Sequence, residues 1–128
     1  MGSSFPNCVL LVDDSAIIRR SLRRVFEQAG WEVCGEAENG HEAIEKAKHL
    51  NPQVIVLDLS MPLMNGLTAG RILKQMLPAV SLILFTLHGN LLPVNDLRLA
   101  GISAVVSKGD SAGTLLKAAE NLVKRSAA

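Results

Sequence analysis

The chain has 128 residues, of which 48% are apolar and 20% charged. That is enough apolar material for one packed core, and it is too hydrophobic for a disordered segment. Thirteen Lys and Arg against twelve Asp and Glu leave a net charge of +1, so electrostatics give no case for nucleic-acid or membrane binding. No segment reaches the ~18 apolar residues of a membrane span, and no secretion signal is visible, which predicts a cytoplasmic protein. Cys8 and Cys34 form no Cys-x-x-Cys motif and are expected to be small buried residues.

The first predicted element is a strand at Cys8–Val12, where a continuous apolar run indicates burial on both faces. Ser15 then caps a helix whose apolar residues follow three-four spacing, and Gly30 suits its left-handed end. The helix carries four arginines, which we interpret as a solvated outer face: Arg19, Arg20, Arg23 and Arg24.

A second strand is predicted at Trp31–Ala37, which is less apolar and therefore nearer an edge of the sheet. The Asn39-Gly40 turn leads into a helix that ends at Asn51-Pro52. Val54–Leu57 is again purely apolar and predicts a third buried strand, followed by a loop and a helix from about Leu67 to Leu77.

The fourth strand is predicted at Val80–Phe85. The stretch from His88 to Leu99 is expected to hold a short or irregular helix, because Pro93 would have to lie in its first turn. Ala104–Val106 predicts the fifth strand, and Thr114–Lys124 a last amphipathic helix. Strands that alternate with helices predict an α/β fold with one parallel sheet and crossover helices.

Polar residues follow four of these strands where each strand ends. Asp13 and Asp14 come after the first strand, Asp58 after the third, Thr86 after the fourth, and Lys108 soon after the fifth. In an open parallel sheet the carboxyl ends of all strands meet at one edge, where ligands bind. The sequence therefore predicts that these five side chains converge on one site.

The chemistry of that site follows from the residue types. Three carboxylates brought together repel one another unless a cation lies among them, and Mg²⁺ prefers carboxylate, carbonyl and water oxygens. Lys108 and Thr86 supply a positive charge and a hydroxyl donor suited to phosphoryl oxygens. Asp58 lies between the paired acids and the lysine, so it is the best candidate nucleophile for forming an aspartyl phosphate.

Four segments together resemble the response-regulator receiver domain of bacterial two-component signalling, over nearly the whole chain. They are Leu11–Ser15, Val56–Gly66, Thr86 after an apolar strand, and Lys108 after Ala100–Ala104. The resemblance implies a flavodoxin-like (βα)5 three-layer sandwich with strand order 2-1-3-4-5. It also implies Asp58 as phosphoacceptor from a histidine kinase, Mg²⁺ bound by Asp13, Asp14, Asp58 and the carbonyl of Ser60, and Thr86 and Lys108 as phosphoryl contacts. In receivers, phosphorylation biases a two-state equilibrium of the surface around the fourth helix and fifth strand.

The chain departs from the common receiver pattern at several positions. Val105 stands where the family commonly has Tyr or Phe, so an aromatic rotamer switch is absent. Gly109-Asp110-Ser111 follows Lys108 in place of the frequent proline, which is closer to receivers of the NarL/LuxR type. Leu87 is bulkier than the usual Ala or Ser and is expected to narrow access to Asp58. The region around the fourth helix is unusually apolar, and we expect core burial rather than a dimer or partner surface for its residues: Leu91, Leu92, Val94, Leu97 and Leu99.

Three functions remain open at this point. The leading hypothesis is a phosphorylation-dependent switch with a receiver domain at residues 8–125, short tails at 1–7 and 126–128, and no turnover of an external substrate. Its expected partners are a sensor histidine kinase or phosphotransfer protein, a second copy of the chain, and DNA only through an output domain outside these residues. The alternative is an atypical receiver that acts as a phosphorylation-independent interaction module. A haloacid-dehalogenase-like phosphatase ranks lowest, because that class carries a second Asp where this chain has Ser60.

Overall fold

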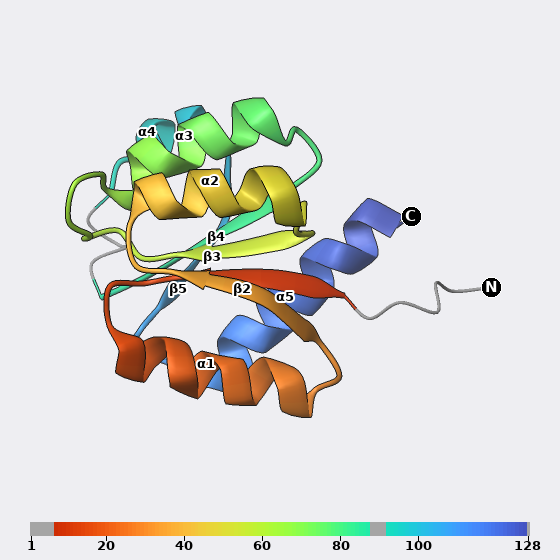
Figure 1. Ribbon diagram of the computed structural model, residues 1–128. Coiled ribbons are helices and arrows are strands. Elements are labelled where there is room, and N and C mark those ends of the chain that lie inside the picture. The colour runs from red at the N-terminus through yellow and green to blue at the C-terminus, as the bar shows by residue number, and fades with distance from the viewer. Residues whose placement is uncertain (1–6, 88–91, 128) are drawn as a thin grey trace.

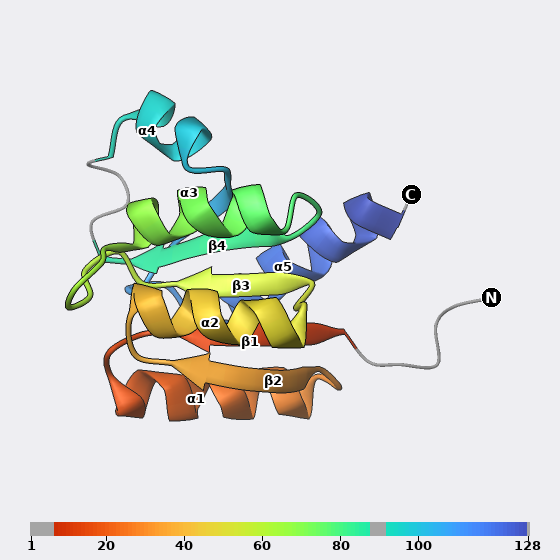
Figure 2. The ribbon, with the colours of Figure 1, turned by 45° about the horizontal axis from the view of Figure 1, so that its top comes forward.

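A five-stranded parallel sheet in the order β2-β1-β3-β4-β5 forms the centre of the computed structural model, which describes residues 7–87 and 92–127 (Figures 1 and 2). The strands are β1 (Cys8–Val12), β2 (Glu32–Ala37), β3 (Val54–Leu57), β4 (Ser81–Thr86) and β5 (Ile102–Ser107). The helices are α1 (Ala16–Gln28), α2 (Gly40–Leu50), α3 (Gly66–Met76), α4 (Val94–Leu99) and α5 (Ala112–Ala127). The predicted flavodoxin-like architecture and strand order are confirmed.

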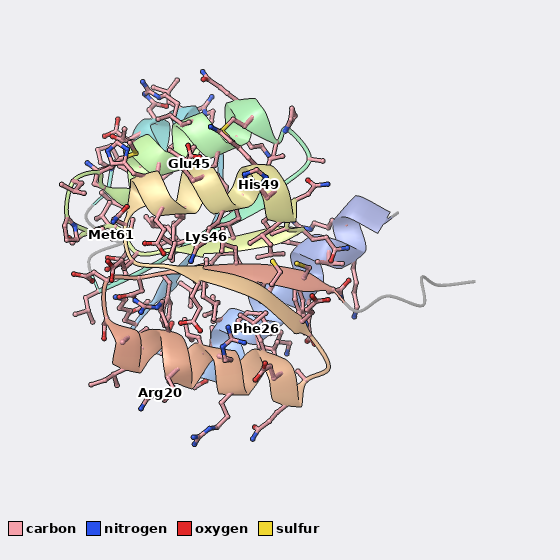
Figure 3. The ribbon with its side chains drawn as sticks, viewed as in Figure 1. Arg20, Phe26, Glu45, Lys46, His49 and Met61 are labelled. Atoms are coloured by element: carbon pink, nitrogen blue, oxygen red, sulfur yellow. The ribbon has the colours of Figure 1, made fainter. Side chains whose placement is uncertain are left out.

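The sheet separates two hydrophobic cores. Helices α1 and α5 cover one face, and α2, α3 and α4 cover the other (Figure 1). Phe26 of α1 points toward the sheet (Figure 3) and meets Trp31 edge-on, with ring centroids 5.2 Å apart. The central strands β1 and β3 contribute to both cores because alternate residues point to opposite faces, so both read as continuous apolar runs.

Short polar residues begin the first three helices. Ser15, Asn39 and Asn65 each have extended backbone, and each side-chain oxygen accepts a hydrogen bond from the backbone N–H three residues later. Gly30 has φ +88°, the left-handed conformation predicted for the end of α1. These caps fix where α1 and α3 start, and thereby set the loops that follow β1 and β3.

Helix α4 is short, as predicted, with Pro93 immediately before its first residue. The expected burial of its apolar residues is wrong for Val94 and Leu99, which are 74% and 66% exposed. Leu92 and Leu97 do pack partly against the core, and Leu91 lies outside the described residues. A helix of six residues that packs beside the edge strand β5 can turn only one side toward the core, so its other apolar residues face solvent.

Three further expectations differ from the structure. Arg20 and Arg24 are exposed as predicted, but Arg19 and Arg23 form ion pairs with Glu36 of β2 and are not simply solvated. Both cysteines are free and only partly buried: Cys8 is the first residue of β1, and Cys34 lies on the edge strand β2. Helix α5 runs over Ala112–Ala127 and is longer at both ends than the predicted Thr114–Lys124. Within residues 7–87 and 92–127, no helix is both long enough and apolar enough to cross a bilayer.

Candidate functional site

The strand order brings the predicted site residues to one edge of the sheet. Asp13 and Asp58 directly follow β1 and β3, which are adjacent in the middle of the sheet. The chain leaves β1 for β2 on one side and returns to β3 on the other, so this is the point where strand order reverses. Thr86 is the last residue of β4, and Lys108 directly follows β5.

Three carboxylates gather at this reversal point. Oxygens of Asp13, Asp14 and Asp58 all lie within 4.8 Å of one another. Asp13 and Asp58 are buried, whereas Asp14 is exposed. An exposed acid beside two buried ones leaves the cluster open to solvent on one side, so a hydrated divalent cation can reach it. Hard oxygen donors at this spacing suit Mg²⁺, and the structure is compatible with a magnesium site at the predicted acids.

Lys108 lies among these acids as their counter-charge. Its Nζ is 2.8 Å from Asp13 Oδ2 and 3.2 Å from Asp58 Oδ1, and its side chain is nearly buried. The Lys108 amine also lies 5.9 Å from the centre of the Phe85 ring, and its backbone N–H donates to the carbonyl of Thr86. The predicted approach of Lys108 to Asp58 is therefore present, together with a shorter contact to Asp13.

The charges in the site perturb one another. Burial raises the pKa of Asp58, and the neighbouring charge of Asp13 raises it further, against the opposing effect of Lys108. Burial alone would lower the pKa of Lys108, but its contacts with Asp13 and Asp58 outweigh that effect and the pKa is raised. The ionised Asp58 carboxylate is thus destabilised by its surroundings, and an additional cation beside the three acids would relieve that repulsion.

Backbone contacts fix the loops that carry the acids. The N–H of Ser15 donates to Asp13 Oδ1 at 2.9 Å, and the N–H of Asp58 donates to the carbonyl of Val12 at 2.9 Å. Gly66, the first residue of α3, donates its N–H to the carbonyl of Leu59 at 2.8 Å. A side chain at Gly66 would collide with the backbone of Asp58, because its Cβ would lie 2.3 Å from the Asp58 carbonyl oxygen.

The remaining predicted site residues, Thr86 and Ser60, lie at the end of β4 and in the loop after β3. Thr86 is buried at the end of β4, and Ser60 is exposed two residues after Asp58. The side chain of Leu87 is mostly exposed and lines a hollow of about 690 Å³ beside β5, together with Leu92, Val94, Leu97, Val105, Ser107 and Asp110. The expected narrowing of access to Asp58 by Leu87 stays a prediction.

Sequence reasoning missed two residues that matter to this geometry. Gly66 is the last residue of the Val56–Gly66 segment that resembles receivers, and the sequence pattern gives it no role of its own, although its position eight residues after Asp58 could have suggested a close backbone approach. Arg19 was assigned to the solvent, yet its Nη1 donates to the carbonyl of Asp13. No sequence signal could have found that contact, because it depends on how α1 lies against β2.

The fold, the acidic cluster and the adjoining lysine define an α/β domain with an acidic site at the carboxyl edge of its parallel sheet. A family model described as the response regulator receiver domain matches residues 9–120, and the chain belongs to this family. The resemblance inferred from the sequence is confirmed at the level of the family, whereas the NarL/LuxR subtype stays a prediction.

Individual relatives agree with this assignment. The chain is 38% identical over 100 residues to the chemotaxis protein CheY of Thermotoga maritima, covering 78% of this chain and 83% of that protein. It is 39% identical over 119 residues to a protein-glutamate methylesterase/protein-glutamine glutaminase of Archaeoglobus fulgidus, covering 91% of this chain but only 34% of that enzyme. The chain therefore spans about a third of the length of that relative. A CheX–CheY–BeF3–Mg²⁺ complex from Borrelia burgdorferi superposes with a TM-score of 0.84 at 26% identity, covering 93% of this chain and 90% of that one.

Proposed function

We propose that Asp58 accepts a phosphoryl group from the phosphohistidine of a sensor kinase or phosphotransfer protein. The phosphorus–nitrogen bond of the donor breaks as a bond forms between phosphorus and an Asp58 carboxylate oxygen. The observation that carries the proposal is the position of Asp58, in contact with Lys108 and within 4.8 Å of Asp13 and Asp14. The family is one of phosphorylation-dependent signalling domains, which supports the same assignment.

Each surrounding residue has a separate part in this proposal. Asp13, Asp14, Asp58 and the carbonyl of Ser60 would hold Mg²⁺, which when bound neutralises charge on the transferring phosphoryl group. The ammonium group of Lys108 contacts the acids and would shift toward the phosphoryl oxygens. Thr86 is the last residue of the neighbouring strand β4, at the same edge of the sheet, and its hydroxyl would be a second phosphoryl contact. A CheY relative in complex with Mg²⁺ and BeF3 supports the choice of metal.

The proposal extends to the setting of the domain. Residues 8–125 act as a receiver that gains and loses its own phosphoryl group in the cytoplasm and turns over no external substrate. Phosphorylation shifts the surface around α4 and β5, through which the domain contacts its output partner or a second copy. The activity of any longer protein to which this domain belongs depends on segments beyond the receiver.

The test is phosphorylation by a small donor. Incubation with Mg²⁺ and phosphoramidate should add the mass of one phosphoryl group, and chelation of the metal should prevent the gain. Asp58→Asn should abolish it, whereas Asp96→Asn is a matched control, because Asp96 is an exposed acid on α4. A mass gain that persists in Asp58→Asn would contradict the assignment of the acceptor.

A second candidate function rests on the exposed apolar residues beside β5. Leu87 and Val105 are exposed, and Val105 replaces the aromatic residue common at this position. An atypical receiver could use this surface for constitutive protein contact without phosphorylation. The absence of a mass gain with phosphoramidate, with acetyl phosphate and with a phosphorylated histidine protein would favour this function over the first.

A further inference from the structure

Helix α1 carries two kinds of arginine. Arg20 points away from the molecule (Figure 3), and Arg24 is also exposed. Arg19 and Arg23 instead face the edge strand β2, and the side chain of Arg19 is only 15% exposed. A guanidinium that is taken out of water to this extent requires fixed partners for its donors.

Glu36 of β2 supplies the anchor for both arginines. Arg19 Nε donates to Glu36 Oε1 at 2.9 Å, and Arg23 Nε donates to Glu36 Oε2 at 2.8 Å. Lys46 of α2 donates to the backbone carbonyl of Glu36 from the opposite face of the sheet. Burial would raise the pKa of Glu36, but its hydrogen bonds to Arg23 and Arg19 outweigh this and hold the pKa below its usual value. The anchor is therefore ionised and fixed at neutral pH.

Because its Nε is bonded to Glu36, Arg19 directs a second donor toward the loop that follows β1 and carries Asp13 and Asp14. Its Nη1 lies 2.5 Å from the carbonyl oxygen of Asp13. That carbonyl belongs to the peptide that joins Asp13 to Asp14, so its orientation determines where the backbone of Asp14 begins. The carboxylate of Asp13 is held separately by Ser15 and Lys108. Arg19 is thus placed to orient Asp14, the exposed acid of the cluster.

We propose that Arg19, anchored on Glu36, is a positioning residue that orients the peptide between Asp13 and Asp14 and thereby strengthens binding of a divalent cation at the acidic cluster. The proposal rests on the proposed function, since it concerns the same site. Arg19 does not touch the reacting atoms; it acts through the backbone that carries two of the acids. A group that orients metal ligands in this way typically changes metal affinity by ten- to a hundredfold when it is removed.

The direction in which Mg²⁺ affinity changes when Arg19 is replaced distinguishes a positioning role from a purely electrostatic one. A positive guanidinium near three acids repels an incoming cation, so an Arg19 that acted only through its charge would weaken Mg²⁺ binding, and its removal would strengthen it. An Arg19 that positions the loop has the opposite effect, because its removal lets the Asp13–Asp14 peptide rotate. Arg23 is the matched control, because it bonds the same Glu36 carboxylate from the next turn of the same helix.

The experiment compares Mg²⁺ affinity by isothermal titration calorimetry in the wild type, Arg19→Gln, Arg19→Lys and Arg23→Gln. We expect Arg19→Gln to weaken Mg²⁺ binding about tenfold and Arg23→Gln to change it less than about twofold, although each variant loses one bond to Glu36. Arg19→Lys keeps the charge but has a single donor group, so it should resemble Arg19→Gln. The deficit in phosphorylation rate with phosphoramidate should shrink as Mg²⁺ approaches saturation, which general destabilisation of the fold would not produce.

Two results would overturn the positioning role alone. In one, Arg19→Gln binds Mg²⁺ as tightly as the wild type or more tightly. In the other, Arg23→Gln loses as much affinity as Arg19→Gln, which would make the loss a general consequence of weakening Glu36. A wild-type chain that neither binds Mg²⁺ nor gains a phosphoryl group would overturn the proposed function, and the positioning role with it.

Discussion

Substitution of Gly66 by alanine should displace the candidate nucleophile without touching its side chain. The added Cβ would lie 2.3 Å from the carbonyl oxygen of Asp58 and 3.1 Å from the Cα of Leu59. Cβ atoms essentially never approach a heavy atom more closely than 3.0 Å, so the two backbone segments must separate by at least about 0.7 Å. Neither contact is the end of a flexible side chain, and the loop that carries Asp58 must therefore move.

Gly66→Ala should lower both the stability of the fold and the rate of phosphorylation. Overpacking of this kind costs about 1–3 kcal/mol, against a gain of under about 1 kcal/mol from replacing glycine at the start of a helix. A net loss of about 1–2 kcal/mol corresponds to a fall of roughly 3–8 °C in Tm for a domain of this size. A displacement approaching 1 Å at a reacting group lowers rate by up to about a hundredfold, so we expect phosphorylation to slow by one to two orders of magnitude.

The assay is the rate of mass gain with phosphoramidate and saturating Mg²⁺, measured beside thermal unfolding. Gly113→Ala is the matched control, since the nearest atom to its added Cβ is the Ser111 hydroxyl at 3.7 Å, an ordinary contact in the first turn of α5. The control should be as stable as the wild type or slightly more stable, with an unchanged rate. A Gly66→Ala variant that reacts at the rate of Gly113→Ala would refute the argument from close approach.

Three further predictions concern stability, each measured by chemical denaturation. Leu63 has φ +71° and is 82% exposed. Leu63→Asn should therefore stabilise the domain by about 1 kcal/mol, because asparagine adopts this left-handed backbone with less strain. An unchanged denaturation midpoint would show that Leu63 makes compensating contacts. Because burial and the charge of Asp13 raise the pKa of Asp58, its ionised form destabilises the metal-free fold, and Asp58→Asn should be more stable than the wild type at pH 7. This advantage should shrink as pH falls below the pKa of Asp58 in the folded state and vanish below the ordinary pKa of an aspartate; a less stable variant at pH 7 would contradict this. Because the pKa of Glu36 is lowered, its ion pairs stabilise the fold above the ordinary pKa of a glutamate, and Glu36→Gln should lose up to about 1 kcal/mol of unfolding free energy at pH 7. The variant and the wild type should become equally stable once pH falls below the pKa of Glu36 in the folded state. A difference that is independent of pH would refute the ionic origin.

The sequence alone located all five strands and the polar residues at or just after the ends of four of them, although the observed bounds of β2, β4 and β5 differ from the predicted ones. β3 is Val54–Leu57 and β1 is Cys8–Val12 in the structure as in the prediction, because a strand buried on both faces must be apolar throughout and this pattern is local. The positions of Asp13, Asp58, Thr86 and Lys108 at one edge follow from that pattern and from the parallel arrangement of the strands. Helix caps such as Ser15 were equally visible, since a cap and the N–H that it accepts from lie three residues apart.

Only the tertiary structure decided the contacts between segments that are distant in sequence. Arg19 and Arg20 are adjacent and chemically identical, yet one bonds the carbonyl of Asp13 and Glu36 while the other faces solvent, because α1 turns only one side toward β2. The exposure of Val94 and the collision that a side chain at Gly66 would meet likewise depend on contacts between segments and not on local sequence. Local sequence fixes the type of each element through backbone and side-chain preferences, but the side of a helix that is buried depends on where its neighbours pack.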